Sequence, residues 1–353
     1  MDHDREEDGA GHEAPLEPER RIVDPHLHLW DIPGAAEALQ EAQTFLVPEA
    51  ARLIAASGHR VTHSVFVECH AMYRPDGPAA YRSLGETEFA TGMAAMAASG
   101  LYGPCRLANR IIANIDLCSD GAERVIEAHQ AVAGDRFRGV RMNTAFSPAG
   151  LFGWPCDPAL AQRLADPALV DGARVLADRG LSLDVWCLHP QLPRVIELAR
   201  AVPELSIILD HVGTPDMRAS YGKHPDVALR EWQGYIRDLA ELPNVVVKIS
   251  GLSMDVTAPL SARTGRASSG QLAEQWRSRV NAVLDAFGPA RCMFASNYPA
   301  DRSAGSYGAI WNAFKRLAQE YSEAEKEQLF TGTAAATYDI ALGESENGSA
   351  TNR

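Results

Sequence analysis

Eight short apolar segments recur along the chain, and stretches with a helical spacing separate them. In stretches such as "GAERVIEAHQAVAG" and "QWRSRVNAVLDAFG", apolar residues return every three or four positions, as on one face of a helix. The apolar segments, which have the composition of buried strands, span residues 21–29, 61–69, 110–117, 137–143, 181–188, 205–212, 244–252 and 291–299.

Strands that alternate with helices indicate a parallel sheet covered by helices, and eight repeats predict its closure into a (β/α)8 TIM barrel. An open, doubly wound sheet is the alternative. The first segment is not followed by a GxGxxG motif, which disfavours that alternative.

Two predicted connections, residues 70–109 and 144–180, are too long to be plain turns. Both follow the carboxyl ends of strands, the face on which barrel enzymes carry their active sites. They contain aromatic, charged and glycine-rich stretches, so we expect them to form walls or lids of a pocket rather than simple packing excursions. The polar stretch at 257–271 is expected to be mobile.

The two ends of the chain differ from its body. Residues 1–20 contain eight acidic residues and two arginines, which predicts a disordered, solvated tail, and residues 344–353 are polar and predict a second one. The barrel domain is therefore expected to span residues 21–343.

Composition narrows the possible partners and location. The formal net charge of -13 disfavours nucleic-acid binding, which requires clustered lysine and arginine. The sequence contains no run of about 20 apolar residues that would span a membrane and no export signal at its start, so we expect a cytoplasmic protein. The six cysteines have no CxxC spacing, which is typical of reduced thiols packed as small apolar groups. A small-molecule substrate is expected, and a homodimer stays open.

Polar residues capable of binding a metal or a proton gather at the ends of the apolar segments. His26 and His28 lie two positions apart on a strand, so both are expected to face the barrel mouth. Four further segments end in such groups, namely Glu68, His189, His211 and Asn297. Packing explains the apolar residues of these segments but not so many polar groups at their carboxyl ends, which indicates a site on this rim.

The motifs "DPHLHLWD", "LDHVGTP", "KISGL" and "FASNYP", in this order, resemble the branch of the amidohydrolase superfamily that includes fuconolactonase and pyrone-dicarboxylate lactonase. The resemblance covers roughly residues 21–340. It implies a barrel enzyme that opens a lactone, or a related ester or amide, with a water molecule at the carboxyl face, in some members with a divalent metal and in others without. It places His26, His28, His189 and His211 at the histidine positions of the family.

The chain departs from the family pattern at Asn297, where an aspartate usually takes the proton from water. A carboxamide has no basic site near neutral pH, so another group must act as the base. Glu68 is the candidate, and a salt bridge to an arginine is its structural alternative. Asn297 is compatible with an active subfamily, with an engineered inactivation and with a protein that binds without turnover.

Candidate substrate-binding residues lie on the same rim. Arg141 ends the fourth segment, where it would either clamp a substrate carboxylate or pair with Glu68. The candidates for an apolar or aromatic pocket lining are Tyr73, Arg74, Trp154 and Trp186, although core packing is the commoner role of a single aromatic residue. Lys248, inside the seventh segment, is expected to form an ion pair in the barrel interior.

The leading hypothesis is thus a hydrolase of a small lactone or a related carboxylated compound. A divalent metal, zinc or manganese, would be held by His26, His28 and His211, with His189 or Glu68 as a supplementary ligand. A metal-free variant would use the histidines to grip the carbonyl oxygen instead. The alternatives are a metal-dependent decarboxylase of an aromatic acid, and a binding protein without catalysis.

Overall fold

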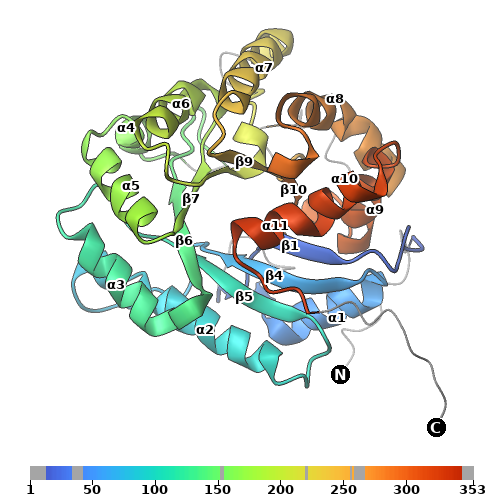
Figure 1. The fold of residues 1–353 in the computed structure, drawn as a ribbon, viewed down its shortest axis with the longest axis horizontal. Coiled ribbons are helices and arrows are strands. Elements are labelled where there is room, and N and C mark those ends of the chain that lie inside the picture. Colours follow the sequence, from blue (N-terminus) through green and yellow to red (C-terminus); the bar gives the residue numbers. More distant parts are fainter. Residues whose placement is uncertain are drawn as a thin grey trace.

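A computed structural model describes residues 13–33, 43–151, 155–218, 222–254, 257 and 267–343. Within these ranges, parallel strands form an eight-stranded sheet whose neighbours follow chain order, with helices on its outside (Figure 1). The strands are β1 (Ile22–Leu27), β4 (Val61–Val67), β5 (Arg106–Ala113), β6 (Phe137–Asn143), β7 (Ser182–Trp186), β8 (Ile207–Leu209), β9 (Val245–Ile249) and β10 (Cys292–Phe294).

The sheet closes through the segment that follows β10. Leu27 of β1 forms a parallel bridge with Tyr298, and the backbone N–H of Asn297 donates to the carbonyl of His26 at 3.0 Å. The predicted (β/α)8 barrel is therefore confirmed, and the open sheet is excluded.

The helices cover the barrel from outside (Figure 1). Most connections carry one long helix, and the two connections predicted to form pocket walls carry α2 and α5, so much of their length is barrel helix. The helices are α1 (Val47–Ser57), α2 (Leu84–Ala98), α3 (Ala122–Ala133), α4 (Leu160–Arg163), α5 (Ala168–Asp178), α6 (Leu192–Ala201), α7 (Pro225–Ala240), α8 (Ser269–Phe287), α9 (Tyr307–Leu317), α10 (Glu323–Glu327) and α11 (Thr333–Thr337). Strands β2 (Trp30–Asp31) and β3 (Thr44–Phe45) pair beside the barrel.

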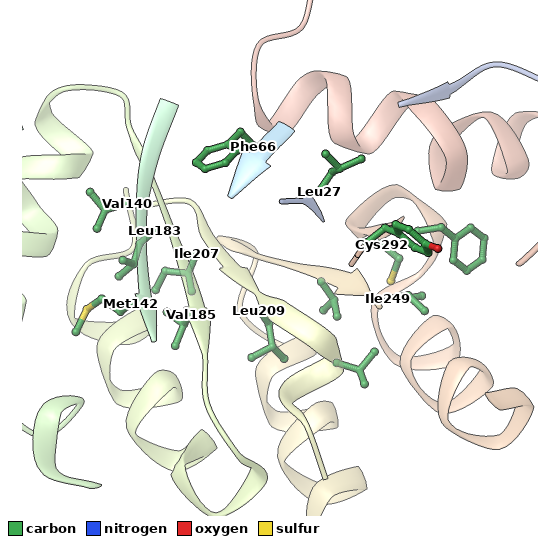
Figure 2. Packing of buried hydrophobic residues seen from close by; sticks show 14 of the residues in the cluster. Leu27, Phe66, Val140, Met142, Leu183, Val185, Ile207, Leu209, Ile249 and Cys292 are labelled. Atoms are coloured by element: carbon green, nitrogen blue, oxygen red, sulfur yellow. The ribbon is translucent and has the colours of Figure 1, made fainter. Parts of the chain in front are cut away.

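Side chains alternate along the strands between two apolar clusters. One cluster packs the strands against the helices, and Figure 2 shows Met142, Val185 and Leu209 within it. The other joins side chains from several strands to the end of α11, and it includes Val23, Val65, Val67, Ile112, Ile208, Met293 and Tyr338.

Charged side chains occupy the strand positions next to this second cluster. Lys248 of β9 forms ion pairs with Asp184 of β7 and with Asp210, which follows β8, and all three side chains are fully buried. The hydroxyl of Tyr338 donates to Asp184 at 2.8 Å. The interior ion pair predicted for Lys248 is therefore present, with two carboxylates as its partners.

The packed chain begins before residue 21, contrary to the predicted boundary of the disordered tail. The backbone N–H of Leu16 donates to the Asn312 side chain at 2.7 Å, and Lys315 donates to the Leu16 carbonyl at 2.6 Å. Residues 13–20 thus contact α9. No helix within the described ranges is both long and apolar enough to cross a membrane.

Two helical glycines differ sharply in their surroundings and allow a test of the helix packing. A Cβ at Gly172 of α5 would lie 2.3 Å from the carbonyl oxygen of Leu117, whereas a Cβ at Gly234 of α7 would meet nothing within 4 Å. We expect Gly172→Ala to lower the free energy of unfolding by about 1–3 kcal/mol, because α5 must move away from the barrel. Gly234→Ala should raise it by about 0.5–1 kcal/mol, since alanine is the better helix former.

Urea unfolding of both variants measures this difference. Equal effects of the two substitutions would contradict the close approach of α5 to Leu117.

Candidate active site

Three buried histidines meet at the carboxyl end of the barrel. His26 lies in β1, His28 follows it, and His211 follows β8. The ring centre of His26 is 5.0 Å from that of His28 and 4.5 Å from that of His211. The structure therefore brings together the three residues predicted as metal ligands.

Each of these rings has a partner for its Nδ1 atom. His28 Nδ1 lies 2.8 Å from the carbonyl oxygen of Val67, which can only accept, so this nitrogen carries the proton. His211 Nδ1 shares a 2.9 Å hydrogen bond with the hydroxyl of Ser250. His26 Nδ1 lies 3.5 Å from Asp210 Oδ1 and 3.4 Å from Lys248 Nζ. With Nδ1 engaged in this way, Nε2 is the nitrogen of each ring that remains available to bind a ligand.

The site keeps these imidazoles neutral. Burial lowers the pKa of His28 to about 4 and that of His211 to about 3, and it lowers the pKa of His26 well below its usual value. A neutral imidazole offers a lone pair, which is the form that binds a metal. His26 Nε2 is buried and finds no hydrogen-bond partner among the described residues.

The donors fit a divalent metal that accepts nitrogen and oxygen ligands, such as zinc. His26, Asp210 and His211 offer ligand atoms that all lie within 4.8 Å of one another, and His28 stands beside this group. Asp210 also pairs with Lys248 at 3.3 Å and with Arg141 at 3.4 Å. A carboxylate held by two cations suits the role of orienting His26 Nδ1, as outer-shell carboxylates commonly do at metal sites.

A strained turn places His211 in this group. His211 and Val212 have φ values of 54° and 53°, in the left-handed region that residues other than glycine rarely adopt. The ring of His211 also needs a glycine beside it, because a Cβ at Gly251 would lie 2.7 Å from its Cγ atom. Such strain costs of order 1–3 kcal/mol and is typical of functional sites.

Glu68 lies at the rim within a small charged cluster. Its carboxylate is fully buried, 3.1 Å from His70 Nδ1 and 3.5 Å from Arg141 Nη1. Burial alone would raise the pKa of Glu68, but His70 and Arg141 outweigh it and hold this pKa below the usual value. Of the two roles predicted for Arg141, the geometry matches the pairing with Glu68, since Arg141 also donates to the Glu68 carbonyl at 2.9 Å.

Asn297 is paired with a carboxylate that sequence reasoning did not identify. Its Nδ2 atom donates to Asp301 Oδ1 at 3.1 Å, and its carboxamide also lies within hydrogen-bonding reach of His28. Burial raises the pKa of Asp301 to about 7, although hydrogen bonds from Asn297 and the Gly251 backbone oppose the shift. Asn297 has a φ of 51°, a left-handed conformation that asparagine tolerates better than most residues.

The remaining predicted residues lie in different surroundings. Trp186 faces the site, with its ring centre 6.0 Å from that of His211 and Arg141 stacked on it at 5.3 Å. His189 Nδ1 accepts from the Asp216 backbone at 2.9 Å, and its Nε2 lies 3.8 Å from Glu231.

The other predicted pocket residues are Tyr73, Arg74 and Trp154. Tyr73 stacks on His70 with ring centres 5.7 Å apart. Arg74 is exposed and pairs with Glu88, which places it at the surface rather than in a pocket lining. Trp154 lies outside the described residues.

Asp210, Asp301 and His70 complete the site and were missing from the sequence prediction. Asp210 precedes His211 within "LDHV". A charged residue at the end of an apolar strand could have indicated a site residue there. Asp301 and His70 lie in turns beyond strand ends, where strand alternation gives no direction for a side chain.

Comparisons with known proteins agree with this geometry. The Amidohydrolase family model matches residues 23–340. Protein y4mH of Sinorhizobium fredii is 29% identical across 90% of this chain and 98% of its own length. An L-fucono-1,5-lactonase of Burkholderia multivorans is 39% identical, over 44% of this chain and 51% of its own length.

A crystal structure of a Burkholderia multivorans amidohydrolase with bound zinc has a TM-score of 0.69 and 27% identity, and the match covers 91% of this chain and all of that one. The chain belongs to the amidohydrolase family, as its motifs predicted. It is an enzyme of the hydrolase class that this family defines.

The hydrogen bond between Asn297 and Asp301 can be tested by adding a second carboxylate and then by exchanging the amide and the carboxylate. Asn297→Asp would place two carboxylates side by side in a buried site, where both cannot ionise at once. We expect a loss on the order of 1–3 kcal/mol in unfolding free energy at pH 8. The loss should shrink toward pH 5, because a carboxyl whose folded pKa is raised contributes stability that disappears as the pH rises through that pKa.

The exchanged variant Asn297→Asp/Asp301→Asn again has one amide and one carboxylate. Its stability at pH 8 should lie close to that of the parent in thermal unfolding. An exchanged variant less stable than Asn297→Asp alone would contradict the pairing.

Proposed function

We propose that the protein hydrolyses a small lactone at the carboxyl face of the barrel. The observation that carries the proposal is the convergence of His26, His28 and His211, each held at Nδ1 and each neutral. The similarity to L-fucono-1,5-lactonases supports a cyclic ester as the substrate class.

His26, His28 and His211 would hold a divalent ion, and the buried, unpartnered Nε2 of His26 supports this assignment. Zinc is favoured by the imidazole donors and by the zinc-bound relative, and manganese is the alternative. Such an ion polarises a carbonyl and lowers the pKa of water. In the metal-free variant of the proposal, the same imidazoles would grip the carbonyl oxygen.

Glu68 is the proposed proton acceptor, since Asn297 cannot serve as a base. Its ionised state is maintained by His70 and Arg141, so it is ready to accept a proton near neutral pH. Arg141 then holds Glu68 in place rather than clamping the substrate. The role of Asn297 is to donate and accept hydrogen bonds beside His28.

Trp186, which lies beside His211, belongs to a small apolar cluster next to the site. The cluster combines the last residue of β7 with side chains from the segments after β6, β7 and β9, and it comprises Ala145, Leu151, Trp186, Leu188 and Met254. The cluster fits the apolar face of a small cyclic substrate, since binding sites combine apolar walls with a few polar groups. Ala145 and Leu151 in this cluster support the expectation that the connection after β6 borders the substrate.

Metal content and activity of one variant pair test the proposal. We expect His26→Ala to lose tightly bound metal and to hydrolyse lactones at least 10²-fold more slowly than the parent, in line with the loss of a metal-activated water. His63→Ala, a matched control on β4 whose ring contacts Thr62, should change neither property. Elemental analysis and a panel of lactones measure both.

Full activity of a metal-free preparation would refute the metal assignment. The metal-free mechanism, in which the imidazoles bind the carbonyl oxygen, would then remain. Release of carbon dioxide from aromatic acids, without lactone opening, would identify a decarboxylase instead.

A further inference from the structure

His70 connects the buried carboxylate of Glu68 with solvent. Its side chain is 54% exposed, whereas that of Glu68 is 0% exposed, and the two side chains approach to 3.1 Å. His70 itself has a φ of 61°, so a strained backbone turns this residue back toward the end of β4.

The ring of His70 is held in place by its neighbours. It stacks on Tyr73 at an interplanar angle of 22°, and the amide of Asn114 lies 3.5 Å from its Nε2 atom. The charged groups that face it are Glu68, Glu86 on α2 and Arg141 on β6. The hydrogen bond with Glu68 raises the pKa of His70, burial opposes this shift, and the attraction of both carboxylates adds to it.

Lactone hydrolysis requires a path by which protons leave the site. As the water oxygen bonds to the carbonyl carbon, Glu68 takes one proton from the water and returns it to the ring oxygen as the ring C–O bond breaks. The new carboxylic acid then ionises by giving its proton to Glu68, so each turnover leaves one proton on Glu68 that must reach solvent. Glu68 is buried, and the guanidinium of Arg141 offers only N–H donors, so it has no atom that could accept a proton from Glu68.

We propose that His70 carries this proton between Glu68 and solvent. Its Nδ1 atom receives the proton from Glu68, and its exposed ring releases a proton to water from Nε2. This role rests on the proposed function, in which Glu68 is the base, and extends it by a residue that neither the family resemblance nor the sequence pattern assigned. The strained backbone and the Tyr73 stack keep the ring within reach of Glu68.

Rescue by free imidazole tests the relay. In weak buffer, we expect His70→Ala to lower kcat by roughly 10²-fold, as loss of a proton-transfer group does, with KM nearly unchanged. Imidazole added to the medium should restore kcat in proportion to its concentration, because it can occupy the vacated space and accept the proton. Glu68→Gln should also lose kcat but should show no rescue, and His63→Ala should show neither loss nor rescue.

The outcomes separate the relay from the proposed function. If Glu68→Gln lowers kcat but His70→Ala keeps full activity, or loses activity without rescue, the relay is wrong and the base assignment stands. If Glu68→Gln keeps full activity, both are wrong. His70→Gln preserves the size of the side chain and supplies a second measurement should the alanine variant fold poorly.

Discussion

The buried ion pair of Lys248 with Asp184 and Asp210 is the interaction on which the site depends. Removing one member of a buried ion pair costs about 3–5 kcal/mol, because its partner remains as an unpaired charge. Burial would raise the pKa of Asp210, but Lys248 and His26 hold it well below the usual value. Asp210 is therefore a fixed negative charge beside His26, and the position of that imidazole follows from the charges packed inside the barrel.

The backbone conformations of the residues after the strands determine where the polar side chains of the site point. His70, His211 and Asn297 all have φ values between 51° and 61°, outside the range of a strand. Each lies two or three residues after its strand, and each makes a contact with a residue in or after a neighbouring strand. The strands hold the ends of these turns in place, and the strained turns fix the positions of the polar side chains. Such strain is expected where the position of a functional side chain matters more than local stability.

Much of this arrangement follows from the sequence. Strand and helix periodicity predicts the barrel, and the shared face of His26 and His28 follows from alternation on β1. The same alternation contains a signal for the charge cluster, because Asp184 and Lys248 interrupt otherwise apolar strands at inward positions. Glu68 shows the limit of this reasoning, since β4 ends at Val67 and the next residue turns toward Arg141.

Pairings that depend on turns could not be predicted. The segment expected as a strand at 291–299 is a strand only over Cys292–Phe294, and the following turn brings Asp301 back to Asn297. Local spacing likewise could not show that the ring of His189 faces Glu231 and the Asp216 backbone. Such contacts arise from the folded chain and leave no periodic trace in the sequence.

The central claim is that three neutral imidazoles, each held at Nδ1, form one metal site through Nε2. X-ray absorption spectroscopy of the zinc-loaded protein tests this most directly, because it counts the ligands and gives their distances. We expect three imidazole nitrogens at about 2.0–2.1 Å and no sulfur shell. Fewer than three imidazoles, or a sulfur ligand at about 2.3 Å, would contradict the claim.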